Sequence, residues 1–179
     1  MQFEWQLEHA TLPADDITLD KTLFCNRLKQ LRPTGCSSTQ APSAPIFDPL
    51  WQGIGCGPVS VPNWARNLTS VYLNNISPNY SGDLDAPFPG VSFLDACNAH
   101  DRCYSISANQ YACDGAFQAS MNAACGDSIS GNSFVICSAF AATYFGAVVQ
   151  FGKGAYNEAQ RVQQCAAWHF EMSANGCPK

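Results

Sequence analysis

Three side chains with acid–base character lie close together near the middle of the chain. His100 and Asp101 are adjacent, and Asp114 directly follows Cys113. An imidazole can take a proton from water when its other nitrogen is held as N–H, and a carboxylate such as Asp114 can hold it in that form. Because this set contains no Ser or Cys nucleophile, it predicts that His100 activates water directly as a general base.

Asp101 is suited to a second task beside the same site. On a helix it projects about 100° away from its neighbour His100. A hard cation such as calcium binds carboxylate and carbonyl oxygens together. Gly55-Cys56-Gly57 is a glycine-flanked segment whose carbonyls can turn toward such an ion. The pattern predicts a calcium ion that polarises an ester carbonyl, with the Gly57 N–H assisting the oxyanion.

Two helices are expected to position these groups. Ser92 and Asp95 have the spacing of a capping box, with Ser92 as the N-cap, which predicts a helix over about 93–108. A second helix is predicted over about 111–125 and is expected to end at Gly126. The link between the helices is short, so we expect them to lie antiparallel.

A disulfide between Cys103 and Cys113 is expected to hold this helical hairpin together. The two cysteines flank the link symmetrically, so they can face each other across the hairpin. His100 and Asp114 each lie within about one turn of that disulfide. We therefore expect both side chains to share the face between the helices.

The rest of the chain predicts a mainly α, disulfide-rich fold. Residues 17–31 are weakly helical, and 155–172 predict a helix of mixed polarity. Residues 134–151 form a very apolar helix that is shorter than the roughly 20 residues of a membrane span, which favours a buried core helix. Glycine and proline predict mostly loop over 51–90, and alternation predicts a short strand over 2–8.

Composition points to an oxidising compartment. The ten cysteines are an even number spread along the chain, which predicts up to five disulfides in a secreted protein but leaves their pairing open. Three N-x-[ST] sequons begin at Asn67, Asn75 and Asn79 and agree with export. The first residues lack the basic start and apolar core of a signal peptide, as expected of a mature form.

Charge excludes one class of partner. The chain has only nine Lys and Arg residues and a formal net charge of -5. Nucleic-acid binding proteins carry clustered positive charge, so we expect no nucleic-acid partner. An acidic protein also gains little from an anionic membrane surface, so we expect any membrane contact to be apolar.

The motif Cys97-x-x-His100-Asp101-x-Cys103-Tyr104, followed by Cys113-Asp114, resembles the secreted phospholipase A2 superfamily. The sequence of these segments is most similar to the group XII-like and microbial forms of the superfamily, and the resemblance covers roughly residues 55–125. It implies an α-helical, disulfide-linked phospholipase A2-like fold. It also implies a carboxylic ester hydrolase that cleaves the sn-2 ester of glycerophospholipids with calcium, releasing fatty acid and lysophospholipid at a membrane surface or micelle.

The resemblance also implies roles for particular residues. It makes His100 the base, Asp114 its support, and Tyr104 the hydrogen-bond partner of Asp114. It assigns the calcium ligands and two disulfides, namely Asp101 with the carbonyls of Gly55, Gly57 and Val59, and the pairs Cys56–Cys97 and Cys103–Cys113. The pairing of Cys25, Cys36, Cys125, Cys137, Cys165 and Cys177 stays open.

Residues 1–50 lie outside the resemblance and are expected to form an N-terminal extension or appendage. Residues 51–179 would then be a phospholipase A2-like domain with extra C-terminal helices. An alternative is a non-catalytic relative that binds lipid or a receptor. Pro58 favours this alternative, because it has no N–H and follows Gly57 where the family is usually glycine-rich. The intact set of His100, Asp101 and Asp114 favours the enzyme.

A structural zinc site is a further alternative for the same motif. Cys97, His100, Cys103 and Cys113 are all possible zinc ligands. Such a site would leave Asp101 and Asp114 without a role, and the other six cysteines would still require an oxidising compartment, which makes it the weaker hypothesis.

Overall fold

The computed structural model describes residues 17–45, 53, 55–56, 71, 73–75, 77, 80–107 and 109–178. This part of the chain is mainly α-helical and contains no β-strand, only an isolated bridge between Phe88 and Val91. The strand predicted over 2–8 lies outside the described residues, as do the Gly57 and Val59 positions. A short helical stretch includes residues 71 and 73–75, within the region expected to be mostly loop.

The predicted helices are present. Their bounds are Ile17–Gln30 (α1), Leu94–Ile106 (α3), Gln110–Ser128 (α4), Asn132–Phe151 (α5) and Lys153–Ala174 (α6). One predicted end is wrong, because α4 continues through Gly126 to Ser128. Cys125, the preceding residue, is fully buried and bonded to Cys137 of α5. This tertiary anchor outweighs the low helix propensity of glycine, which costs about 1 kcal/mol.

The start of α3 differs from the predicted capping box by one residue. Phe93 is the N-cap and makes no side-chain capping bond. Ser92 Oγ still accepts the Leu94 N–H at 3.2 Å, and it donates to the Asp85 carbonyl at 3.3 Å. The prediction that Ser92 is the N-cap is therefore wrong, because the side chain of Phe93 is fully buried and fixes where the first turn begins.

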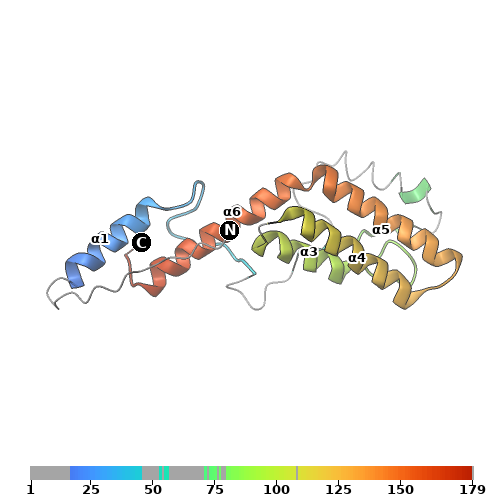
Figure 1. The fold of residues 1–179 in the computed structure, drawn as a ribbon, viewed down its shortest axis with the longest axis horizontal. Coiled ribbons are helices and arrows are strands. Elements are labelled where there is room, and N and C mark those ends of the chain that lie inside the picture. Colours follow the sequence, from blue (N-terminus) through green and yellow to red (C-terminus); the bar gives the residue numbers. More distant parts are fainter. Residues whose placement is uncertain are drawn as a thin grey trace.

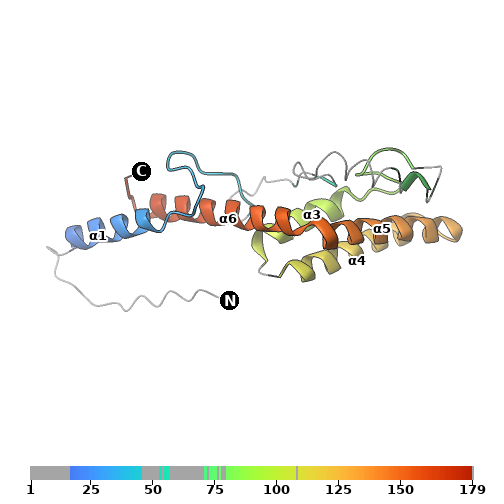
Figure 2. The ribbon, with the colours of Figure 1, turned by 90° about the horizontal axis from the view of Figure 1, so that it is seen from above.

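The molecule is elongated, and α6 connects its two ends. Figure 1 shows α4 packed beside α3 and α5, with α3 also against the first part of α6, while α1 lies near the other end of α6. The view from above shows the same arrangement (Figure 2). Two separate groups of buried side chains correspond to these two ends.

Helix α5 supplies one side of the larger core. Phe140 and Tyr144 face inward, where Phe140 lies 6.0 Å from Tyr80 between ring centroids. The opposite face is exposed, and Val135 keeps 64% of its surface accessible. By length and composition alone α5 is long and apolar enough to cross a membrane. Only 22% of its most apolar stretch is buried inside the protein. The prediction of a buried core helix thus holds for one face of α5 only.

The smaller core fixes the N-terminal segment to the end of α6. Disulfides Cys25–Cys177 and Cys36–Cys165 join the two. The indole N–H of Trp168 donates to the Leu28 carbonyl at 2.7 Å. All ten cysteines are paired, and such disulfide use is typical of extracellular or other oxidising compartments.

Candidate functional site

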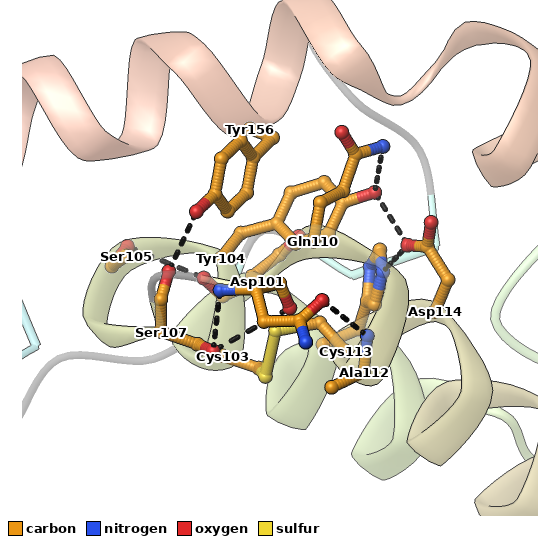
Figure 3. Close-up of a disulfide and its surroundings, with 12 residues drawn as sticks. Asp101, Cys103, Tyr104, Ser105, Ser107, Gln110, Ala112, Cys113, Asp114 and Tyr156 are labelled. Atoms are coloured by element: carbon orange, nitrogen blue, oxygen red, sulfur yellow. Dashed lines mark hydrogen bonds and ion pairs between the residues drawn. A yellow bond between two sulfur atoms is a disulfide. The ribbon is translucent and has the colours of Figure 1, made fainter. Parts of the chain in front are cut away.

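The site is built on the hairpin of α3 and α4. Three residues separate these helices, and the disulfide Cys103–Cys113 joins them beside the link. Asn109 is the N-cap of α4, and its side chain accepts the Ala112 N–H at 3.1 Å (Figure 3). The disulfide and the helix cap together fix how α3 and α4 are aligned, and therefore which of their side chains face each other.

His100, Asp114 and Tyr104 meet in that register. His100 Nε2 lies 2.9 Å from Asp114 Oδ1. The Tyr104 hydroxyl donates to the same oxygen at 2.6 Å, as Figure 3 shows. All three side chains are buried. The structure therefore brings together the three residues that were predicted to be catalytic.

The surroundings of His100 favour its neutral form. The Phe117 ring stacks on the imidazole at a centroid distance of 4.5 Å and an interplanar angle of 26°. Burial lowers the pKa of His100 below its usual 6.5, and this effect exceeds the opposing hydrogen bond and charge of Asp114. A neutral imidazole with one nitrogen held by a carboxylate is the form that a general base requires.

Tyr104 stays protonated beside Asp114. Burial raises the pKa of its phenol, and the hydrogen bond to Asp114 raises it further. The Gln110 amide lies 3.5 Å from the Tyr104 oxygen, on α4 (Figure 3). The buried Asp114 carboxylate thus has two hydrogen-bond partners, the His100 imidazole and the Tyr104 hydroxyl. These bonds offset the free-energy cost of removing the carboxylate from water.

Helix α6 holds the end of the helix that carries His100. The Gln160 amide donates to the carbonyls of Tyr104 at 2.5 Å and Ser107 at 2.9 Å. The Tyr156 hydroxyl donates to the same Ser107 carbonyl at 2.8 Å, and its ring meets that of Tyr104 edge-on (Figure 3). These bonds satisfy carbonyls that a helix end leaves unpaired. Gln160 and Tyr156 were not among the predicted site residues, because no local sequence pattern links them to a motif about 50 positions earlier.

Gly152, at the junction of α5 and α6, leaves room for the Tyr104 hydroxyl. A β-carbon at this position would lie 2.5 Å from that hydroxyl oxygen and would also collide with the Val148 carbonyl. The backbone of Gly152 is ordinary helix, with φ of -71°, so the need for glycine here is one of space.

We expect Gly152→Ala to destabilise the protein by about 1–3 kcal/mol, because the added methyl group overpacks the site. It should also displace the Tyr104 hydroxyl from Asp114. Urea unfolding measures the first effect. Gly154→Ala is the matched control, since nothing lies within 4 Å of a β-carbon there. Equal stability of both variants would contradict this account of Gly152.

The structure describes only part of the predicted calcium site. The Gly55 N–H donates to Asn98 Oδ1 at 3.1 Å, and the Cys56 N–H donates to Asp85 Oδ1 at 2.6 Å. Gly55 has a φ of +77°, and a β-carbon there would lie 2.7 Å from the Asp85 carboxylate. The disulfide Cys56–Cys97 is present and ties this segment to the start of α3. The Asp85 carboxylate therefore lies too close to Gly55 for any side chain at this position.

Asp101 follows Asn98 by three positions on α3, and residues with that spacing share a helix face. The half-buried Asp101 carboxylate therefore lies on the face against which the Gly55 segment packs. Carboxylate and carbonyl oxygens are the donors that calcium prefers, so Asp101 and Gly55 fit the ion chemically. Gly57 and Val59, the other predicted ligands, lie outside the described residues.

The zinc hypothesis for the motif is wrong. Cys97 is bonded to Cys56, and Cys103 to Cys113, so these sulfur atoms are not available as thiolates. His100 is instead engaged with Asp114.

No protein-family model, curated protein or solved structure matches this chain.

Proposed function

We propose that the protein is a secreted, calcium-dependent phospholipase A2 that hydrolyses the sn-2 ester of glycerophospholipids. The observation that carries the proposal is the shared oxygen of Asp114, which contacts His100 at 2.9 Å and Tyr104 at 2.6 Å. The helices that carry these residues, α3 and α4, are joined by a short link and a disulfide, and α6 holds the end of α3. This degree of support is typical of groups that must keep a catalytic geometry.

Because Nε2 of His100 is hydrogen-bonded to Asp114, its other ring nitrogen, Nδ1, is the one that would contact a water molecule. In the proposed reaction this nitrogen takes a proton from water as the water oxygen attacks the ester carbonyl. Asp114 stabilises the imidazolium that forms, and Tyr104 keeps the carboxylate in place. The imidazolium then returns the proton to the departing glycerol oxygen as the ester C–O bond breaks. Fatty acid and lysophospholipid result, and His100 is neutral again.

Calcium, when bound, would stabilise the negative charge that develops on the ester carbonyl oxygen. Asp101 and the Gly55 carbonyl would hold it, together with the carbonyls of Gly57 and Val59. Asn98 and Asp85 would support the loop through its N–H groups.

The test is fatty-acid release from phosphatidylcholine vesicles, with millimolar calcium and then with excess chelator. We expect release only with calcium. Asp101→Asn should abolish the activation by calcium, because the amide lacks the charge that a hard cation requires. Asp95→Asn is the control, an exposed residue of the first turn of the same helix, and should behave as the unmodified protein. Unchanged activation in Asp101→Asn would remove Asp101 from the ligand set.

The pH profile of the reaction is a separate prediction. Only neutral His100 can accept a proton, and burial places its pKa below 6.5. Activity should therefore be constant at neutral pH and should fall as the pH drops through a midpoint below 6.5. Initial rates between pH 4.5 and 8, at saturating calcium, measure this. A midpoint above 6.5 would contradict the environment described for His100.

Lipid binding without turnover is a second candidate function. The exposed apolar face of α5 favours it, because contiguous apolar surface often marks a contact with lipid or a partner. Co-sedimentation with vesicles, combined with no fatty-acid release from the oxidised and folded protein under either condition, would support this function over the enzyme.

A further inference from the structure

A second cluster of reactive side chains lies in the smaller core, where the segment after α1 meets α6. It consists of Cys36, Cys165 and His169, all of them buried. One ligand atom from each lies within 4.8 Å of the others, and within the described part of the chain no other group of three such side chains does so. Cys165 and His169 are one helical turn apart, so α6 itself presents both.

The imidazole of His169 has one unsatisfied nitrogen. Nε2 contacts the Ser37 carbonyl at 2.8 Å, which makes it the protonated nitrogen. Nδ1 is buried and has no hydrogen-bond partner. A buried polar atom without a partner costs about 1–3 kcal/mol. Histidines that bind metals typically donate their other N–H to a backbone carbonyl, as His169 does to Ser37.

We propose that reduction of Cys36–Cys165 converts this cluster into a zinc site. A dithiol reductant transfers two electrons to the disulfide and becomes a disulfide itself, leaving two thiols on the protein. Both thiols release their protons on binding Zn²⁺, and His169 Nδ1 donates its lone pair as the third ligand. Zinc would then replace the covalent bond as the link between residues 31–45 and α6.

The required movement is small. The Cα atoms of Cys36 and Cys165 are 5.4 Å apart. In a tetrahedral site with zinc–sulfur bonds of about 2.3 Å, the two sulfur atoms lie roughly 3.8 Å apart. Rotation of the two side chains can provide this separation, so the backbone need not change.

One member of the cluster, Cys165, borders a cavity that gives reductant and metal a route to the disulfide. Cys165 lines a cavity of about 320 Å³, together with Gly35, Ser37 and Arg161. Arg161 is paired with Glu158 at 2.5 Å, so its positive charge beside the cavity is offset. Water in this cavity would supply the fourth ligand of a tetrahedral zinc ion.

The neighbouring disulfide provides an internal comparison. Cys25–Cys177 belongs to the same core but is not part of the group that contains His169. The proposed site therefore depends on one disulfide and one histidine, and it is independent of the His100 site and its proposed activity.

Cobalt(II) is the probe, because tetrahedral thiolate coordination gives it visible absorption that aqueous cobalt lacks. The full chain is titrated with Co²⁺ in its oxidised form and after mild dithiol reduction and removal of the reductant. We expect no coordination by the oxidised chain and one Co²⁺ per reduced chain, displaced by Zn²⁺. Zinc should also protect Cys36 and Cys165, but not Cys25 and Cys177, from alkylation, as read by peptide mass spectrometry.

Two variants separate the proposed site from adventitious binding to free thiols. His169→Gln keeps a donor for the Ser37 carbonyl but removes the ligand nitrogen, so Co²⁺ should bind at least about tenfold more weakly. The double variant Cys25→Ser, Cys177→Ser should still bind one Co²⁺ after reduction. The proposal is overturned if the reduced chain binds no cobalt, whether or not it stays folded. It is also overturned if His169→Gln binds cobalt with the same affinity as the unmodified chain.

Discussion

His100→Gln is expected to lower fatty-acid release by about 10²–10⁴-fold, the range that a positioned general base contributes. Glutamine can occupy the space of the imidazole and keep a contact with Asp114, but it cannot accept a proton from water. The helical hairpin should stay intact, since the disulfide Cys103–Cys113 and the α6 contacts do not involve position 100. Initial rates with phosphatidylcholine vesicles and saturating calcium measure the loss, and circular dichroism checks the fold.

His169→Gln is the matched control for this experiment. His169 is also a buried histidine with one nitrogen on an oxygen acceptor, but it lies in the smaller core. In the oxidised protein this variant should release fatty acid at the unmodified rate. If turnover survives His100→Gln, His100 is not the base, and the proposed mechanism is wrong.

Phe140→Ala should produce the largest loss of stability, about 3–5 kcal/mol. The Phe140 ring is fully buried and lies about 6 Å from the rings of Tyr80 and Phe88. The disulfide Cys125–Cys137 holds α5 near this ring, which limits how far the core can collapse around the cavity. Unfolding in guanidinium chloride under oxidising conditions measures the change.

Val135→Ala on the same helix serves as the comparison. Its side chain is 64% exposed, so we expect a change within about 0.5 kcal/mol. A large loss in this variant would mean that the outer face of α5 is covered by something else in solution. Similar small losses in both variants would contradict the core described here.

The sequence predicted the helices well because their signals are local. The capping-box spacing of Ser92 and Asp95, together with the expected stop at Gly126, placed the two helices within a few residues of Leu94–Ile106 and Gln110–Ser128. Errors occurred where tertiary contacts outweigh local preference. Gly126 does not end α4, because the adjacent Cys125 is anchored to α5. Ser92 is not the N-cap, because Phe93 is drawn into the core.

The central residues of the candidate site were predictable, but their supports were not. His100 and Asp114 lie on two neighbouring helices with a disulfide between them, so spacing places them near one another, and Tyr104 was expected there from the family resemblance. Gln160 and Gly152 reach the same site from the far end of the chain. Their roles depend on how α6 crosses α3, and helix crossing is set by packing that no sequence period records.

The disulfides of this protein also imply an order of assembly during synthesis. Cys56–Cys97, Cys103–Cys113 and Cys125–Cys137 join cysteines at most 41 positions apart. Cys36, by contrast, pairs across 129 positions, and its partner emerges on the order of ten seconds later at typical rates of translation. The partner of Cys25 is synthesised later still, because these two cysteines are 152 positions apart. The α3–α4 hairpin can therefore oxidise while the chain is still growing. The thiols of Cys25 and Cys36 stay open to wrong partners until α6 and the residues after it have been synthesised, so an isomerase should speed maturation most at these two bonds.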